Sequence, residues 1–429
     1  MRGKIVAVAA LILVVGAACS NASTGGGNAS ASAGANTVGN VPRETQGVTP
    51  TEIKVGSLAS ITGPLGNQYA PIADGVEAYL NMINAEGGVY GRKIKLTQKL
   101  DDQTNPSRDI SQAQALNEQY GDFAVVGVAV PLFTGGTYLG QQSVPTFGWN
   151  VNPEWKGPLS MFGEKGSYLD FTGPGPLGPW FAKKVGAQKA GVLAYGVVQS
   201  QDCATGTANS DKKYGIDLAF QDTSLPFGTT NIDADLQRIK QSGVQLMSTC
   251  MDPTGNVLLS RGIRQNNLHI IQSWPNGYDQ ATLNKYPDLM EGVYFSSGFT
   301  PFQSAKSSKG MQQFLAQMHK DFPNDQISEV ELAGWISANM FVDGLKAAGK
   351  DVNRTKLINA VNSFHDWTGN GIWPAQAPRD WTYDHNRHSP HPDCVAFIQV
   401  QHGKFVPVFG TASDPFICIP HNAATLPST

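Results

Sequence analysis

The chain has 429 residues, enough for two or three domains at roughly 150 residues each. Hydrophobic residues make up 41% of the chain, which supports sizeable cores and excludes a disordered polymer. Charged residues make up only 15%, and the formal net charge is -3. Such a chain has no basic surface for nucleic acid, so we expect small molecules or proteins as partners.

The amino-terminal residues have the pattern of an export signal. Arg2 and Lys4 precede an apolar run over residues 5–15, which is too short to span a membrane, and small residues then lead into Cys19. This order resembles the lipobox of bacterial lipoproteins, which implies removal of residues 1–18 and lipidation of Cys19. Ordinary signal cleavage nearby, which would leave a free cysteine, is the alternative.

A tether is expected to follow the signal. Residues 20–47 are Ser, Gly, Ala, Asn and Thr with almost no large apolar residue, so they cannot bury enough surface to order themselves. No later stretch has about 18 consecutive apolar residues. We therefore expect a lipidated flexible tether over residues 19–50. It would hold an extracytoplasmic protein, in the periplasm or on the outer cell surface, at the membrane through its lipid alone.

Four cysteines remain after Cys19. Cys203, Cys250, Cys394 and Cys418 form an even number, as expected of disulfides in an oxidising compartment. Four cysteines allow three pairings. We favour Cys203 with Cys250 and Cys394 with Cys418, because each pair lies within a segment that should be locally compact.

Possible metal ligands gather near the third of these cysteines. They are His385, His388, His391, Asp393 and Cys394. Pro390 and Pro392 break any helical face that would align these side chains, so no metal site is expected.

Short apolar strands alternate with helical patterns along the rest of the chain. A first series has strands at residues 53–59, 93–99, 123–128 and 144–147. Helices begin at Pro71 and at Asn105-Pro106, because proline suits a first helical position. A second series has strands at residues 190–195, 215–220, 244–250, 269–274 and 292–297, with the clearest helices between them at 232–241 and 256–265.

The last part of the chain changes this order. Helices are expected at residues 309–322, 329–348 and 353–363, followed by a hairpin over 395–409 that turns at Gly403. Two series of β-α-β units predict an α/β protein of two doubly wound lobes with mainly parallel sheets. We expect lobe 1 at residues 51–168 and 299–370 and lobe 2 at residues 169–298 and 371–429.

Several fragments resemble one family of binding proteins. They are Lys54-Val55-Gly56, Thr62-Gly63-Pro64, residues 81–96 (NMINAEGGVYGRKIKL), Asp101-Asp102 with Asn105-Pro106, Val144-Pro145 and Asn152-Pro153-Glu154. In this order, from about residue 53 to residue 409, they are similar to the leucine/isoleucine/valine-binding branch of the type I periplasmic binding proteins. The resemblance implies two lobes joined by three hinge strands, a small ligand enclosed between them, and delivery to the permease of an ABC importer.

The place of the ligand follows from the geometry of the sheets. In open parallel sheets, ligands bind beyond the carboxyl ends of the strands, where helix amino termini offer unpaired N–H groups. The residues expected there are Tyr69, Phe133, Trp149 and Trp274 as walls, Thr134, Asn150, Gln199, Asp252 and Asn276 as polar contacts, and Leu132 beside them. Phe133, Trp149 and Trp274 could instead belong to the cores.

The expected cleft differs from that of the amino-acid binders in the family. Those proteins hold the ligand carboxylate with a Ser/Thr-rich loop and a threonine, and the ligand ammonium with an acid of the second lobe. The matching positions here are Pro131-Leu132-Phe133, Val151, and a position near Pro275-Asn276. Without these ionic contacts, an α-amino acid would leave its charged ends poorly paired, and an unpaired buried charge is costly. We therefore predict a less zwitterionic ligand. The ligand would then be more apolar, such as an aromatic or alicyclic carboxylate or an amide.

Enzyme motifs give little support for catalysis. Residues 173–178 (GPGPLG) match a dinucleotide-binding pattern, but no apolar strand precedes them. Asp101 and Asp102, beside a helix start, are expected to be turn and cap groups and not an acid–base pair. We therefore expect a binding protein without cofactors, and not an enzyme. A sensor module that signals through a membrane partner is the alternative function, and a hydrolytic lipoprotein is a more distant one.

Overall fold

The computed structural model describes residues 37–63, 68–166, 171–382, 385–386 and 391–429. The expected signal peptide, Cys19 and the first part of the expected tether lie outside the described residues, as does His388. Within the described ranges, no helix is long and apolar enough to cross a lipid bilayer.

The first sheet consists of five parallel strands in the order β2-β1-β3-β4-β5. They are β1 (Glu52–Ala59), β2 (Lys93–Asp101), β3 (Ala124–Ala129), β4 (Thr146–Gly148) and β5 (Met161–Gly163). Every residue of β3 is buried, as in a central parallel strand that is covered by helices on both faces. This sheet and the helices on it form lobe 1.

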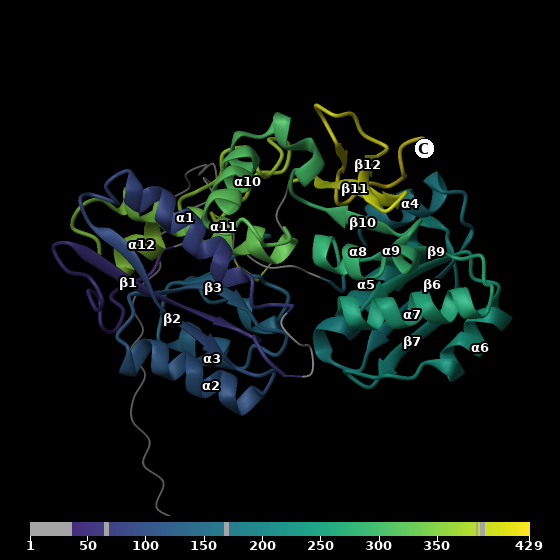
Figure 1. Cartoon of the computed structure of the whole chain (residues 1–429), viewed down its shortest axis with the longest axis horizontal. Helices are drawn as coiled ribbons and strands as arrows, with labels where there is room; N and C mark the ends of the chain where they lie inside the picture. Colours follow the sequence, from purple (N-terminus) through teal and green to yellow (C-terminus); the bar gives the residue numbers. More distant parts are fainter. Residues whose placement is uncertain (1–36, 64–67, 167–170, 383–384, 387–390) are drawn as a thin grey trace, which may run out of the picture. The chain divides into compact units, whose positions relative to one another are not determined.

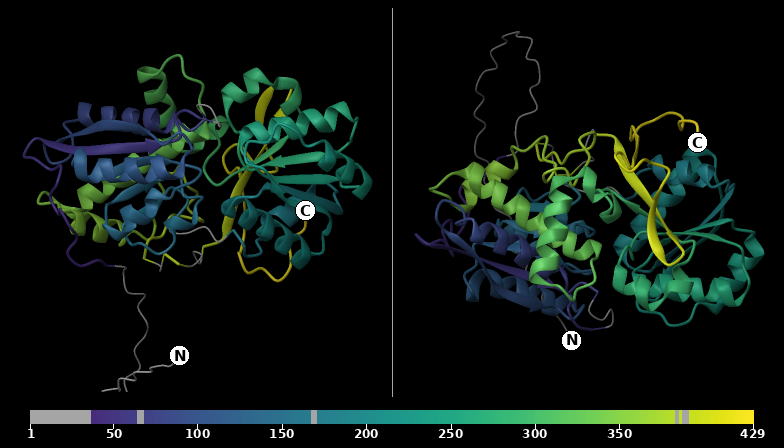
Figure 2. Two further views of the ribbon diagram at one scale, coloured as in Figure 1. Left: turned by 90° about the horizontal axis from the view of Figure 1, so that it is seen from below. Right: turned by 45° about the horizontal axis from the view of Figure 1, so that its top comes forward.

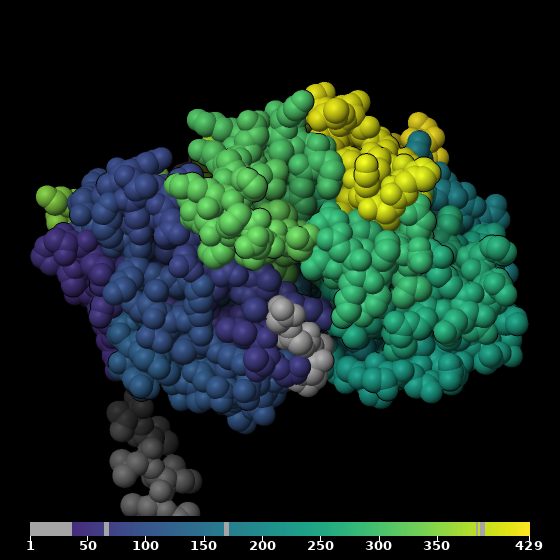
Figure 3. All heavy atoms as spheres, viewed as in Figure 1, coloured from purple at the N-terminus to yellow at the C-terminus, as the bar shows by residue number. Residues whose placement is uncertain are grey.

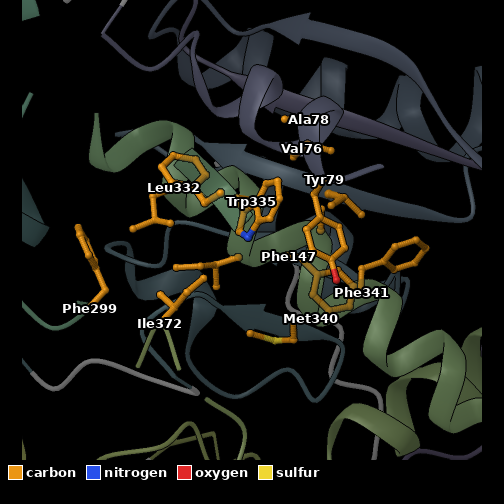
Figure 4. Close-up of a cluster of buried hydrophobic side chains, with 14 of the residues drawn as sticks. Val76, Ala78, Tyr79, Phe147, Phe299, Leu332, Trp335, Met340, Phe341 and Ile372 are labelled. Carbon is orange, nitrogen blue, oxygen red and sulfur yellow. The ribbon is translucent and has the colours of Figure 1, made fainter. Parts of the chain in front are cut away.

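Helices cover the two faces of this sheet. They are α1 (Ile72–Ala85), α2 (Pro106–Gln114), α3 (Gly135–Gln141), α10 (Lys309–Asp321), α11 (Glu329–Ala348) and α12 (Arg354–Val361), with short turns η1 (Ala115–Gln119), η2 (Pro153–Trp155) and η3 (Phe302–Ser307). Figure 1 shows α1 and α11 on one side of the strands and α2 and α3 on the other. The core of lobe 1 lies where α1, α11 and β4 meet, with the ring centroids of Tyr79 and Trp335 4.8 Å apart (Figure 4).

The second sheet follows the order β12-β11-β10-β9-β8-β6-β7, and β13 pairs with β11 beside this path. Its strands are β6 (Lys189–Tyr195), β7 (Asp217–Leu225), β8 (Leu246–Cys250), β9 (Ile271–Trp274), β10 (Tyr294–Ser297), β11 (Asp393–Gln401), β12 (Lys404–Val408) and β13 (Phe416–Ile419). Strands β6 to β10 are parallel, and β11 runs antiparallel to β10, β12 and β13. This sheet and its helices form lobe 2.

The helices of lobe 2 connect its parallel strands. They are α4 (Leu177–Lys184), α5 (Val198–Tyr214), α6 (Asp233–Ser242), α7 (Pro253–Gln265), α8 (Gln280–Lys285) and α9 (Pro287–Met290). The chain then returns to lobe 1 for α10 to α12, because α11 packs on α1, β3 and β4, and ends in lobe 2 with β11 to β13. Figure 2 shows the yellow strands β11 and β12 beside the teal strands, and in Figure 3 the yellow atoms lie against teal and green ones. The two doubly wound, mainly parallel lobes predicted from the sequence are confirmed.

Helix boundaries agree with the sequence where a clear stripe or cap exists. Helix α11 spans the expected residues, and its capping box places the Ser328 hydroxyl on Glu331. Asn105 caps α2, accepting from the Arg108 amide at 3.0 Å. The sequence does not delimit α5, because its buried side chains are small or polar and leave no apolar stripe. Strands β5 and β13 were also not expected, since they are only 3 and 4 residues long.

The segment before β1 is attached to lobe 1. The Val38 amide donates to Asn359 Oδ1 at 2.6 Å, Val41 is buried, and Glu44 accepts from the Thr355 amide at 3.1 Å. The expectation of a flexible tether as far as residue 50 is therefore wrong for residues 38–50. The reason is that hydrogen bonds to α12 and the packing of Val38, Val41 and Val48 on the core hold this segment.

Arg354 joins the same region to the sheet from inside. Its side chain is fully buried, and it donates to the carbonyls of Phe123 and Asp122 at 2.9 and 2.8 Å and to Asn117 Oδ1 at 3.1 Å. Burial lowers the pKa of Arg354 to about 10, so the group stays charged at neutral pH. Three acceptors satisfy a cation that burial alone would make costly.

Both disulfide pairings favoured from the sequence are present. Cys203 in α5 is bonded to Cys250 at the end of β8. Cys394 in β11 is bonded to Cys418 in β13. The second bond takes Cys394 out of the histidine group considered as a metal site, while His385 lies against the Pro158 carbonyl and Asn362 Oδ1.

Candidate ligand-binding site

The carboxyl ends of strands from both sheets meet at one pocket, which we call the ligand pocket. Lobe 1 and the segment after β5 contribute Tyr69, Pro131, Trp149, Val151, Lys165 and Phe171. Lobe 2 contributes Tyr195, Gln199, Ser200, Cys203, Phe227, Cys250, Met251, Asp252, Pro275 and Asn276. Most of these residues end a strand or follow one within about three residues, which is where ligands bind in open parallel sheets.

Two further hollows continue the ligand pocket. An inner pocket shares Tyr69, Trp149, Lys165 and Asn276 with it and adds Glu164, Phe299 and Glu329. A third hollow shares Lys165, Phe299 and Glu329 with the inner pocket and adds Trp373 and Arg379. Lys165 borders all three hollows, so it is the common point of the cleft.

Two aromatic pairs form the walls of the ligand pocket. Tyr69 and Trp149 of lobe 1 have ring centroids 5.3 Å apart, and Tyr195 and Phe227 of lobe 2 have theirs 5.2 Å apart. Such rings offer large apolar surfaces at little cost in side-chain entropy. The pocket can therefore hold the apolar body of a small molecule.

Asp252 has a structural task within this pocket. Its carboxylate caps α7, accepting from the amides of Thr254 and Gly255 at 3.1 and 3.2 Å. It also accepts from the Tyr195 hydroxyl, and both burial and the charge of Asp252 raise the pKa of Tyr195 above its ordinary value. Both carboxylate oxygens are thus already engaged, and Asp252 positions the wall around it.

Hydrogen bonds join the lobes across the cleft. Gln199 Nε2 in α5 donates to the Pro131 carbonyl of lobe 1 at 2.5 Å. Gln68 Nε2 of lobe 1 donates to Thr254 Oγ1 of lobe 2 at 2.7 Å. These contacts enclose the ligand pocket from two sides.

Charged side chains also border the cleft. Lys165 Nζ lies 3.7 Å from Glu164 Oε1 and 5.9 Å from the Trp149 ring centroid. Burial raises the pKa of Glu329 to about 7, although Lys165 and the Gly277 amide oppose the shift. Glu164 is also raised in pKa by burial. The cleft as a whole therefore contains charged groups, which come from positions outside the aligned motifs.

Arg379 is the second cation of the cleft. Its guanidinium stacks over Trp373 at 3.6 Å from the ring centroid, and Nη1 donates to the Lys165 carbonyl at 2.9 Å. Burial lowers the pKa of Arg379 to about 10. Arg379 therefore holds the backbone of Lys165 in place.

Five of the ten residues predicted for the site line the ligand pocket. They are Tyr69, Trp149, Gln199, Asp252 and Asn276. Asn276 Nδ2 donates to the Met251 carbonyl at 3.0 Å, so it also fixes the neighbouring wall. Gln199 lies in the first turn of α5 and not in the expected loop.

The other five predicted residues lie elsewhere. Phe133 packs in a core cluster with its ring centroid 5.3 Å from that of Trp155, and Leu132 is half-buried beside it, outside the pocket lining. Thr134 Oγ1 donates to the Pro106 carbonyl at 2.7 Å. Trp274 is 1% exposed and packs edge-on against Phe295. For Phe133, in the segment between β3 and α3, and for Trp274, at the end of β9, the core alternative is thus the one observed.

Asn150 acts indirectly. Its Oδ1 accepts from the Lys165 amide at 3.1 Å, and its Nδ2 donates to the Gly166 carbonyl at 3.1 Å. It is a positioning residue for Lys165 and not a wall of the pocket.

Sequence reasoning missed Lys165, Tyr195 and Phe227. Tyr195 ends an expected strand, so the rule for parallel sheets could have found it. Lys165 follows β5, whose three residues give no strand pattern. Phe227 lies in the loop after β7, which extends beyond the expected strand end at residue 220.

Two α/β lobes with a pocket at their facing strand ends define a two-lobed binding protein. The chain belongs to the periplasmic binding protein family, whose pattern it matches over residues 52–404. It is therefore an extracytoplasmic solute-binding protein and not an enzyme.

Three relatives illustrate the similarity. The chain is 22% identical over 395 residues to Leu/Ile/Val-binding protein homolog 7 of Brucella abortus (strain 2308), which covers 84% of this chain and 92% of the relative. The branched-chain amino acid transporter substrate-binding protein LivJ of Streptococcus pneumoniae, solved with isoleucine, is 17% identical, with a TM-score of 0.70 over 86% of this chain and 100% of LivJ. A solute-binding protein of R. palustris, solved with benzoate, is 18% identical, with a TM-score of 0.67 over 86% of this chain and 98% of its own.

Proposed function

We propose that this protein is the solute receptor of an ABC importer and that it binds a small organic carboxylate with an apolar body. The observation that carries the proposal is the combination of two aromatic pairs with Lys165 at the common point of the cleft. An apolar body would lie among the rings, and the carboxylate would meet the ammonium group. Isoleucine and benzoate, which the solved relatives hold, are both carboxylates.

An amino acid is the less favoured ligand within this class. The acids that border the inner pocket with Lys165 are Glu164, Asp279 and Glu329. Burial raises the pKa of all three, that of Glu329 to about 7. A group that is partly protonated at neutral pH is a weak counter-charge for an ammonium. Asp252 is engaged by the α7 cap and by Tyr195, so it is also poorly suited to this role.

The mechanism is hinge closure. A ligand between Tyr69 and Trp149 of lobe 1 and Tyr195 and Phe227 of lobe 2 touches both lobes only when they are close. Its affinity for the closed state then shifts the population towards the form that the permease would recognise. A lipid on Cys19 would keep the receptor near that permease. Fatty-acid labelling of the wild-type protein, absent from a Cys19→Ala variant in its own host, would support the anchor, and equal labelling would contradict it.

A thermal-shift screen tests the ligand class. Benzoate, cyclohexanecarboxylate, benzamide, leucine and isoleucine would be compared at equal concentration, because a ligand that binds only the folded state raises the melting temperature. We expect the two apolar carboxylates to give the largest shifts. If leucine or isoleucine gave the largest shift, the apolar-ligand proposal would be wrong while the receptor function would stand.

A further inference from the structure

The Cys203–Cys250 disulfide lies in the wall of the ligand pocket. Both cysteines border the pocket, and the bond joins helix α5 to the end of strand β8. The residues next to it also border the pocket, with Gln199 and Ser200 one turn before Cys203 and Met251 directly after Cys250. One covalent bond therefore connects two separate parts of the binding wall.

The first turn of α5 has few other attachments. Val197 precedes it without a side-chain cap, and Val198 is 56% exposed. An uncapped helix start without a buried apolar residue frays readily. The buried residues of α5 begin only at Ala204, and among the described residues the one side-chain hydrogen bond to the sheet before it is that of the exposed Gln201 to the Thr223 carbonyl at 3.2 Å, so Cys203 is the first covalent attachment of the helix to the sheet.

A second contact of α5 reaches the other side of the pocket. A side chain at Gly206 would lie 1.8 Å from the Phe171 carbonyl, and the Gly175 amide donates to Ser210 Oγ at 2.9 Å. Helix α5 thus supports the segment that carries Phe171, which itself lines the pocket. A displacement of α5 would move both walls.

We propose that the Cys203–Cys250 disulfide positions the first turn of α5 and the end of β8 for ligand binding. The bond holds Gln199 where its side chain reaches Pro131 of lobe 1, and it keeps Met251 and Asp252 beside the aromatic walls. The proposal rests on the proposed function only for the identity of the ligand. The disulfide is a positioning element of the site as well as a cross-link.

The second disulfide provides a matched control. Cys394–Cys418 lies between β11 and β13 and closes a loop of 24 residues, against 47 for Cys203–Cys250. Cys394 borders the third hollow and not the ligand pocket. A Cys418→Ser variant therefore breaks this bond without changing a residue that borders the three hollows of the cleft.

The test compares this control with a Cys203→Ser/Cys250→Ser variant in two measurements. Hydrogen exchange in the ligand-free protein reports on residues 198–205, and calorimetry gives the dissociation constant for benzoate. We expect both variants to melt earlier than the wild type. Only the Cys203→Ser/Cys250→Ser variant should exchange faster at residues 198–205 and bind benzoate about tenfold more weakly.

Each other outcome has a defined meaning. Unchanged exchange at residues 198–205, or unchanged benzoate affinity, would overturn the proposal. If benzoate did not bind the wild-type protein, the carboxylate proposal would be wrong, and the exchange measurement alone would decide on the disulfide. If the Cys203→Ser/Cys250→Ser variant does not fold, a Cys203→Ala/Cys250→Val variant takes its place in the test, because it fills the same space with apolar groups.

Discussion

Lys165 borders the ligand pocket, the inner pocket and the third hollow, yet it lies in a turn directly after a three-residue strand. Three neighbours hold it there. Asn150 accepts from its amide, Arg379 donates to its carbonyl, and the Nζ lies over the Trp149 ring. A lysine held through its backbone can offer its ammonium group to a ligand without first ordering the loop.

Replacing this ammonium should weaken carboxylate binding selectively. In a Lys165→Met variant we expect the affinity for benzoate to fall at least tenfold, about 1.4 kcal/mol, because a charge-assisted hydrogen bond is lost. The affinity for benzamide, which has no charge, should hardly change. Calorimetric titration of both compounds checks this, with the exposed Lys240→Met as control. Equal losses for benzoate and benzamide would show that Lys165 shapes the pocket without pairing with the carboxylate.

The raised pKa of Glu329 makes the stability of the fold depend on pH. Burial raises its pKa from 4.5 to about 7, against the opposing effect of Lys165, with Glu164 and Asp279 adding to the rise. Between these two values the folded protein binds more protons than the unfolded chain. The contribution of Glu329 to stability is therefore present below about pH 4.5 and is lost as pH rises towards 7.

A Glu329→Gln variant isolates this contribution. It should match the wild type near pH 4.5 and be more stable by about 1–2 kcal/mol at pH 8, since glutamine cannot ionise. Urea unfolding at both pH values measures the difference, with the exposed Glu86→Gln as control. A difference that is the same at both pH values would mean that the Glu329 carboxyl is not protonated by burial.

At the scale of elements, helices α1 and α11 cross with almost no space between them. A side chain at Gly334 would lie 2.0 Å from the Ile72 carbonyl, and one at Gly75 would lie 1.8 Å from the Glu331 carbonyl. Backbone atoms cannot yield as a flexible side chain can. The close crossing lets Trp335 reach Tyr79 and brings the start of α11, with Glu329, to the cleft.

An alanine at this crossing should therefore destabilise the fold although alanine favours helices. We expect Gly334→Ala to lower the free energy of unfolding by about 2–3 kcal/mol, because the helices must move apart. Gly178 in α4 has no atom within 4 Å of an added side chain. Gly178→Ala should be neutral or gain up to about 1 kcal/mol from helix propensity. Chemical denaturation of both variants checks the contrast, and a neutral Gly334→Ala would contradict the close crossing.

At the scale of the whole molecule, several side chains join the lobes directly, and Gln199 and Gln68 are two of them. Gln199 reaches Pro131, and Gln68 reaches Thr254, so closure does not depend on the ligand alone. Such contacts favour the closed form before the ligand arrives, while the ligand adds its own contacts to both lobes. The closed population of the ligand-free protein depends on the direct contacts between the lobes. The further rise of that population on binding depends on the contacts of the ligand with both lobes.

Small-angle scattering should detect this shift. We expect the radius of gyration of the wild-type protein to fall when saturating benzoate is added, because the ligand stabilises the closed form. The Lys165→Met variant at the same benzoate concentration should contract less, in proportion to its lost occupancy. No contraction with benzoate shown by calorimetry to be bound would contradict hinge closure.

The sequence by itself determined the architecture and the disulfides. Short apolar runs for the buried strands, and helix starts such as Asn105-Pro106 before α2, are local signals that residues carry with them. The order of the two β-α-β series then restricts how the chain can connect. The fragments that resemble the family added the expectation of a binding cleft between the lobes. Of the ten residues predicted for that cleft, five line the ligand pocket.

Only the tertiary structure decided which side chains face the ligand pocket. Trp274 ends a strand as Tyr195 does, and Phe133 lies between β3 and α3, but the rings of Phe133 and Trp274 turn into the cores. Sequence position alone does not fix that direction. Lys165, Glu329 and Arg379 are far apart in the chain and meet only because the chain returns to lobe 1 after the parallel strands of lobe 2. The charge of the cleft is thus a property of packing between distant segments, which no local pattern encodes.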